Sequence, residues 1–300
     1  MNQPFFSVVI PVYNRSELLV RSLQHLLHQT FKSYEIIIID DGSKENIESI
    51  VKNNIQSEIS IKILRQENLE RGAARNNGIR NAIGEYVVLF DSDDFMQSNH
   101  LEILFSGINK YNYPNFIATK FNFVDIKERT YFSDISKLPA GKYNYKLFLE
   151  GNPLACNICL KRKNSNLLYF EEDRTFAIKE DWMFLMSNLK NDFLTLLPET
   201  TITMFDHQDR SMRSGNQAII YKTFQAVDWI EKNVSLSKDE VRQLEAHKNY
   251  FCSIHAYLDG DKAESIKYSL ESIRKGGIKV KYLSMLLKSI LGRKIILKIK

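Results

Sequence analysis

One stretch decides the fold of this chain of 300 residues: Tyr86-Val87-Val88-Leu89-Phe90-Asp91-Ser92-Asp93-Asp94. Its apolar half predicts a buried strand, and the acidic cluster follows where that strand ends. Asp91 and Asp93 are two residues apart, so both carboxylates can converge on one small volume beyond the strand. Like charges this close are normally relieved by a hard cation, and oxygen ligands favour Mn²⁺ or Mg²⁺. The stretch therefore indicates a cation that accompanies a phosphate ligand, with helix capping as the alternative use of these aspartates.

The residues around that stretch alternate between strand and helix patterns. Strands are expected over residues 6–14 (with Pro11 as the stop), 34–39, 59–64 and 85–90, and helices over 18–27, 45–52 and 70–83. This alternation predicts an α/β fold with a mostly parallel sheet flanked by helices. Ligands of such sheets bind beyond the carboxyl ends of the strands. The polar residues at these ends are therefore expected around one crevice: Asn14, Asp40, Asp41, Asp91 and Asp93.

Four motifs resemble those of the family 2 glycosyltransferases, whose catalytic domain has the GT-A fold. They are Val8–Asn14, Ile37–Ser43, Arg71–Gly78 and Tyr86–Asp94, in the family's order and at its spacing within residues 5–96. The resemblance implies a GT-A type, Rossmann-like sheet followed by a helical C-terminal region. It also implies a nucleotide-sugar site made by Pro11, Tyr13, Asn14, Asp40, Asp41, Arg75, Asp91, Ser92 and Asp93.

The resemblance gives several of these residues a role. Asp40 or Asp41 would contact the nucleobase, and Arg75 would lie by the base or the diphosphate. Asp91 would approach the ribose, and Asp93 would ligate Mn²⁺ or Mg²⁺.

The general base of this family stands in a Glu-Asp pair at the start of a helix, and here that pair is Glu180-Asp181. Residues 179–186 predict the opening of an amphipathic helix, where the helix dipole stabilises carboxylates as anions. Asp181 is therefore expected to deprotonate the acceptor hydroxyl in an inverting transfer, with a role as helix N-cap as the alternative.

Residues 203–214 resemble the loop that follows the base in this family. His207 in this loop is expected to be a third metal ligand, a diphosphate contact or an ordinary polar residue. Arg210 and Arg213 can screen the diphosphate. The family often has an aromatic residue and an arginine where this chain has Asp206 and His207, which leaves the role of the loop open.

The expected organisation is a catalytic domain in residues 1–215, a helical region in 216–274 and a basic amphipathic tail in 275–300. Within the catalytic domain, residues 1–96 would bind the nucleotide and residues 97–215 the acceptor. The tail is basic because nine of the 41 Lys and Arg residues lie in Arg274–Lys300, which has no Asp or Glu. A helical wheel separates the polar Lys281, Ser284 and Lys288 from an apolar face made by Tyr282, Leu283, Leu286, Leu287, Ile290 and Leu291. This tail is expected to lie on an anionic membrane surface or to pack on the protein itself.

Other protein classes are disfavoured by the sequence. No apolar run approaches the roughly 20 residues that span a bilayer, and no cleavable signal begins the chain, so a cytoplasmic location with peripheral membrane contact is expected. Nucleic-acid binding is unsupported because the main domain is slightly acidic. A phosphatase with an Asp nucleophile is disfavoured because Phe95 stands where that class has a threonine.

The expected function is transfer of a sugar from a nucleoside-diphosphate sugar, with UDP favoured, to a hydroxyl of a glycan or lipid-linked acceptor. Such an enzyme would serve surface polysaccharide or glycoconjugate biosynthesis. The alternative is a catalytically inactive module that binds a nucleotide sugar or a carbohydrate.

Overall fold

The computed structural model of this chain describes residues 3–206 and 215–293. These residues form two compact units. The sheet unit comprises the described residues of Met1–Asn144, Pro153–Arg174 and Asn191–His207. The helical unit comprises the described residues of Tyr145–Asn152, Thr175–Lys190 and Gln208–Lys300.

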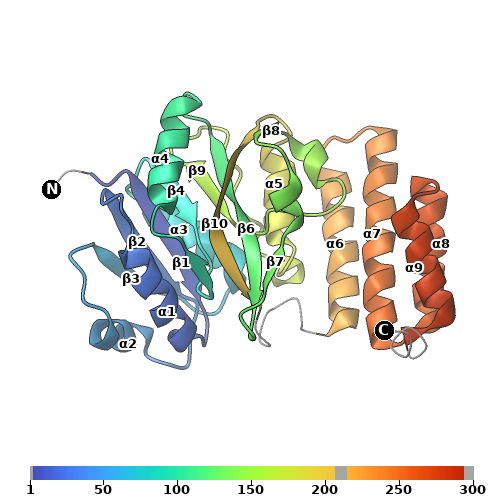
Figure 1. Cartoon of the computed structure of the whole chain (residues 1–300), viewed down its shortest axis with the longest axis horizontal. Helices are drawn as coiled ribbons and strands as arrows, with labels where there is room; N and C mark the ends of the chain where they lie inside the picture. Colours follow the sequence, from blue (N-terminus) through green and yellow to red (C-terminus); the bar gives the residue numbers. More distant parts are fainter. Residues whose placement is uncertain (1–2, 207–214, 294–300) are drawn as a thin grey trace. The chain divides into compact units, whose positions relative to one another are not determined.

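The first half of the sheet unit is an alternating β/α arrangement (Figure 1). Four parallel strands lie in the order β3-β2-β1-β4: β1 (Phe6–Val12), β2 (Tyr34–Asp40), β3 (Ile61–Arg65) and β4 (Tyr86–Leu89). The helices between them are α1 (Ser16–Leu27), α2 (Ile47–Asn54) and α3 (Glu70–Asn81). Every residue of β2 and β4 is buried, as expected for strands covered on both faces. The predicted alternation is confirmed over this half.

The prediction that Pro11 stops the first strand is wrong. β1 continues through Pro11 to Val12, and Pro11 lies opposite Ile39 of β2. The Val9 carbonyl accepts from the Phe90 amide on the β4 side, whereas the Val12 carbonyl accepts from the Asp41 amide on the β2 side. Alternate residues face opposite neighbours, so Pro11 faces the β4 side, where pairing has ended at Val9. The missing proline N–H therefore costs no ladder bond there.

Further strands extend the sheet of the described residues to ten and make it mixed. β9 (Ile158–Lys161) pairs antiparallel with both β4 and β6 (Phe116–Asp125), so β6 runs in the same direction as β4. β10 (Leu194–Asp206) is parallel to β6. The remaining pairs are antiparallel and involve β5 (Asp94–Met96), β7 (Thr130–Phe132) and β8 (Gly141–Tyr143). Helix α4 (His100–Lys110) follows β5.

The helical unit contains five α-helices and the 3₁₀ turn η2 among the described residues (Figure 1). They are η2 (Tyr145–Phe148), α5 (Glu180–Asn188), α6 (Asn216–Asn233), α7 (Lys238–Asp259), α8 (Lys262–Gly276) and α9 (Val280–Leu291). A second 3₁₀ turn, η3 (Arg174–Phe176), begins at the boundary of this unit. The predicted helical character of this region is confirmed. Asp261 accepts from the Glu264 amide at the start of α8, and Gly277, with φ +72°, ends that helix. No helix of the described residues combines the length and the apolar character that a membrane crossing requires.

Candidate functional site

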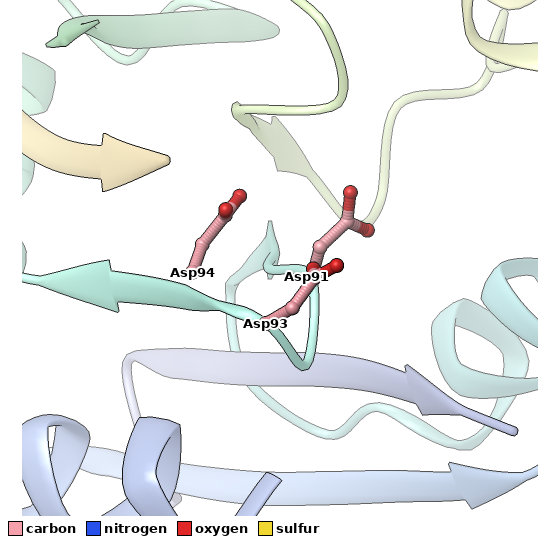
Figure 2. Close-up of side chains that lie close together, drawn as sticks. All are labelled: Asp91, Asp93 and Asp94. Carbon is pink, nitrogen blue, oxygen red and sulfur yellow. The ribbon is translucent and has the colours of Figure 1, made fainter. Parts of the chain in front are cut away.

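An acidic cluster follows β4 at the carboxyl edge of the parallel strands. Asp91, Asp93 and Asp94 each offer a carboxylate oxygen, and these oxygens all lie within 4.8 Å of one another (Figure 2). The hydroxyl of Ser22 in α1 donates to the carbonyls of Ser92 at 3.0 Å and Asp94 at 2.6 Å, which fixes the turn that carries the cluster. Three hard oxygen donors in this volume suit Mn²⁺ or Mg²⁺.

Two expectations about this cluster change. The element after the aspartates is strand β5, and the N-cap position of α4 is Asn99, so the aspartates do not cap a following helix. Asp94 joins Asp91 and Asp93 as a possible ligand, although no separate role was predicted for it. The only sequence feature that marks Asp94 is its place in the acidic run. Whether its carboxylate can reach the cluster depends on a backbone turn that the sequence does not reveal.

Two arginines neutralise charge in the cluster. Nη2 of Arg75 lies 2.8 Å from Oδ1 of Asp91, and Nη1 of Arg15 lies 2.8 Å from Oδ2 of Asp93. Arg75 is buried and its guanidinium lies 5.5 Å from the ring centroid of Phe170. These ion pairs offset part of the repulsion between the neighbouring carboxylates. Arg15 was not among the predicted site residues.

The two aspartates at the end of β2 hold the neighbouring loops in place. Asp40 accepts from the Ser43 amide at 2.9 Å and from Nη1 of Arg65 at 2.6 Å. Oδ1 of Asp41 accepts from Nε2 of Gln66 at 2.8 Å and from the Leu69 amide at 2.9 Å. Both aspartates are buried. These bonds give both residues a structural role, and their contact with a nucleobase stays a prediction.

The residues after β1 are hydrogen-bonded to the loop that follows β2. Asn14 has φ +50°, its amide donates to Oγ of Ser43 at 3.0 Å, and its Oδ1 accepts from the Lys44 amide at 2.8 Å. Tyr13, next to it, is 45% exposed. The structure thus brings the ends of β1 and β2 together at the edge where β4 also ends.

The predicted general base lies in the helical unit. Oδ2 of Asp181 accepts from Nδ2 of Asn152 at 3.0 Å, and Oδ1 accepts from the Trp182 amide at 2.7 Å. The N-cap position of α5 is Lys179, so Asp181 is not the N-cap, although it does accept one N–H of the first turn. Trp182 is itself anchored by a 2.7 Å bond from its indole Nε1 to the Phe148 carbonyl.

Lys179 is a residue that sequence reasoning missed near this aspartate. Its Nζ lies 4.0 Å from the ring centroid of Phe251, in the interior of the helical unit. Burial lowers the pKa of Lys179 to about 8, and the charge of Asp181 opposes this shift. At neutral pH the ammonium group of Lys179 is therefore mostly charged, so the carboxylate of Asp181 has a cationic neighbour. A single lysine before a Glu-Asp pair carries no sequence signal for this burial.

Two other segments lie near the motifs. In the acidic run Glu171-Glu172-Asp173, the exposed Glu172 accepts from Nδ2 of Asn76 at 2.8 Å and pairs with Arg80 at 3.0 Å. This run is therefore fastened to α3. His207, Arg210 and Arg213 lie outside the described residues, and their roles stay predictions.

Comparison with known proteins gives consistent matches. Residues 7–162 match the family described as Glycosyl transferase family 2. Glycosyltransferase GlyG of Streptococcus pneumoniae serotype 4 is 35% identical over 127 residues, which is 42% of this chain and 42% of GlyG. The GalNAc(5)-diNAcBac-PP-undecaprenol beta-1,3-glucosyltransferase of Campylobacter jejuni is 35% identical over 109 residues, which is 36% of this chain and 35% of that enzyme. The matches span less than half the length of either relative.

A solved structure matches over almost the whole chain. TarS 1–349 of S. aureus in complex with UDP-GlcNAc has a TM-score of 0.64 at 19% identity, over 95% of this chain and 79% of that chain. This likeness concerns the fold, and it confirms the predicted GT-A type architecture followed by a helical C-terminal region.

Proposed function

The chain belongs to glycosyl transferase family 2, and we propose from this premise that it is an inverting, metal-dependent transferase of a hexose or a related sugar. The donor in this proposal is a UDP-sugar, and the acceptor is a hydroxyl of a glycan or lipid-linked glycan in surface polysaccharide or glycoconjugate biosynthesis. One observation carries the proposal: three carboxylate oxygens lie within 4.8 Å at the end of β4, inside the segment that matches the family.

In this proposal, the acidic cluster holds Mn²⁺ or Mg²⁺ through Asp93, with Asp91 and Asp94 beside it. The donor set fits such an ion because all three ligands are hard oxygens. When bound, the ion screens the charge that grows on the departing diphosphate. Arg15 pairs with Asp93, so its guanidinium would stand beside the metal site, where it could contact a phosphate of the donor. Arg75 keeps Asp91 oriented toward the ribose.

The nucleoside part of the donor lies at the ends of β1 and β2 in this proposal. The exposed ring of Tyr13 offers a face for stacking on the base. Asp40 or Asp41 contacts the base, with Pro11, Asn14 and Ser92 shaping the same edge. Uracil is the favoured base because TarS, which shares the fold, has been crystallised with UDP-GlcNAc.

Asp181 is the proposed general base. The acceptor oxygen attacks the anomeric carbon while the bond from that carbon to the diphosphate breaks on the opposite face, and the hydroxyl proton passes to Asp181. Proton transfer of this kind contributes about 10²- to 10⁴-fold. Asn152 positions the carboxylate through its 3.0 Å bond, and Lys179 supplies the nearby positive charge.

The acceptor proposal includes membrane contact from the cytoplasmic side. One relative is named for an undecaprenol-linked acceptor, and the basic segment Arg274–Lys300 is suited to anionic lipid. Peripheral association through residues 275–300 would bring the enzyme to such an acceptor.

Nucleotide release from UDP-, GDP- and dTDP-sugars, with Mn²⁺ and with a chelator, tests the proposal. Asp93→Ala should abolish Mn²⁺-dependent binding and release. The matched control is Asp134→Ala, which removes a highly exposed carboxylate of the same unit. Absence of Mn²⁺-dependent binding of any of these nucleotides to the intact chain would refute the proposed donor site. Nucleotide binding without turnover on any acceptor would instead favour the catalytically inactive binding module.

A further inference from the structure

Helix α9 presents two apolar surfaces rather than the single one that its sequence predicts. The first surface packs on the helical unit through Tyr282, Met285 and Ser289, all of which are buried. The ring of Tyr282 lies 5.4 Å from that of Tyr250 in α7, and the hydroxyls of Ser289 and Ser265 are 2.6 Å apart. The sequence placed Tyr282 on an apolar face that either a membrane or the protein's own body would cover, and for Tyr282 the structure shows packing on the protein's own body.

The second surface, here called the apolar ridge, is made by Val280, Leu283, Leu287 and Ile290. These side chains are 85%, 45%, 58% and 48% exposed, in that order. At about 100° per residue they occupy one arc of the helix, on the side opposite the packed surface. A helix that is apolar on both sides is typical of one that also contacts a nonpolar phase.

Two ion pairs of Glu150, with Lys279 and with Lys281, are here called the ionic clamp and hold the start of α9 on the helical unit. Glu150 accepts from Nζ of Lys279 at 2.7 Å and also from Nζ of Lys281. Burial alone would raise the pKa of Glu150, but these two ammonium groups bring it down to about 2, so the clamp stays charged at neutral pH. The start of α9 is therefore tied to its own unit, and Lys281 is engaged with Glu150 rather than facing away as a free surface charge.

The charges near the ridge decide what it can contact. Lys288 and Arg293 are exposed, and the sequence of residues 294–300, which lie outside the described structure, adds three lysines and no acidic residue. Self-association through the ridge would bring like charges together, and four side chains are few beside the roughly 20–30 residues per partner of a stable interface. An anionic lipid surface complements both the cations and the apolar residues.

We propose that the apolar ridge inserts into the interface of an anionic bilayer, with α9 lying in the plane of the membrane while its opposite surface stays packed on the helical unit. This inference rests on the membrane contact in the proposed function and assigns that contact to particular side chains. It requires neither donor nor acceptor, so its failure and a failure of the transferase proposal are distinguishable.

Sedimentation with vesicles tests this assignment. The full chain is mixed with vesicles of phosphatidylcholine alone or of phosphatidylcholine and phosphatidylglycerol in equal parts, and the partition coefficient is measured. Leu287→Glu should lower binding to the anionic vesicles about tenfold or more, because it replaces an inserting side chain with a charge. The matched control is Leu168→Glu in the sheet unit, which changes the charge equally at a residue 52% exposed. Lys288→Glu should lower binding about fivefold or more, since a lysine at the surface contributes about 1 kcal/mol.

Retained circular dichroism and Mn²⁺-dependent UDP binding are expected in all three variants, because each residue is exposed. The assignment is overturned if Leu287→Glu binds like the intact chain, if Leu168→Glu loses as much, or if the intact chain binds both kinds of vesicle equally. It is also overturned if sedimentation velocity shows an intact dimer that Leu287→Glu converts to a monomer, because the ridge would then be an interface between copies.

Discussion

Replacing Gly78 with alanine should disturb the site through helix α3, which also carries Arg75. Gly78 lies in α3, where the helix crosses Val9 of the central strand β1. A Cβ atom at Gly78 would lie 2.2 Å from Cγ1 and 3.0 Å from Cγ2 of Val9. Val9 is fully buried, so its side chain has little room to turn away. The helix must move by about 1.2 Å to restore an ordinary separation of 3.4 Å.

Two opposing effects set the size of the change in stability. Alanine is better than glycine in a helix by about 1 kcal/mol, whereas overpacking a dense core costs about 1–3 kcal/mol and sometimes more. Because the 2.2 Å approach to Cγ1 of Val9 places the overpacking cost in the upper part of that range, about 2–3 kcal/mol, the expected net loss in the free energy of unfolding is about 1–2 kcal/mol. The same shift moves Arg75, one turn earlier in α3, whose guanidinium lies 2.8 Å from Asp91. Nucleotide affinity in the presence of Mn²⁺ should fall as well.

A double-mutant cycle in urea separates this contact from other causes. Val9→Ala removes both γ carbons, after which only Cβ of Val9 remains, 3.1 Å from the added atom. The double variant should lose at least about 1 kcal/mol less than the sum of the two single losses, and part of its nucleotide affinity should return. Losses that add within about 0.5 kcal/mol would refute the reasoning, because the steric conflict with Val9 would then not be the cause.

Three further outcomes are expected. Asp181→Asn should keep donor binding within about twofold but lower single-turnover transfer about 10²- to 10⁴-fold; transfer at the native rate would contradict the assignment of the base. Arg15→Ala should tighten the binding of Mn²⁺ alone about fivefold, because it removes a cation that competes for Asp93. The electron paramagnetic resonance signal of free Mn²⁺ measures this binding, and weaker binding would show that Arg15 supports the metal site instead. Burial lowers the pKa of His100 and of His247 to about 3 from the ordinary 6.5, so each of these two histidines binds a proton in the unfolded chain that it excludes in the folded chain. As the pH is lowered from about 6.5 to 3, the two together should lower stability by up to ~2.7 kcal/mol per pH unit, and a flat stability profile there would contradict it.

The strands and helices of the first half were predictable because their signals are local. Apolar runs such as Tyr34–Ile39 and the 3.6-residue spacing of Leu18–Leu27 need no partner to be recognised, and β2 and α1 agree with them to within two residues. The prediction that the first strand stops at Pro11 was wrong because the effect of a proline in a strand is not decided locally. Whether a proline ends a strand depends on which neighbour its missing N–H would face, and that is settled only when β4 ends its pairing at Val9.

The candidate site was predictable only in the residues that sit in motifs. The partners of these residues come from distant positions: Arg15 is 78 residues from Asp93, and Asn152 is 29 residues from Asp181. Neither partner stands in a pattern that marks it, because an arginine or asparagine in a loop is ordinarily exposed. The importance of Arg15 arises from topology, which brings the end of β1 beside the turn after β4.

Helix α9 shows where periodicity alone stops being informative. A wheel identifies apolar positions, but burial of one arc depends on whether another helix offers a matching surface. Here the small side chain of Ser265 and the lack of one at Gly276 let α9 approach α8 closely. A Cβ at Gly276 would lie 2.8 Å from the ring of Tyr282. That packing selects Tyr282, Met285 and Ser289, and it leaves Leu283 and Leu287 exposed. The sequence therefore predicted the amphipathic helix but not its division into two surfaces, and that division makes packing on the protein and contact with lipid compatible rather than exclusive.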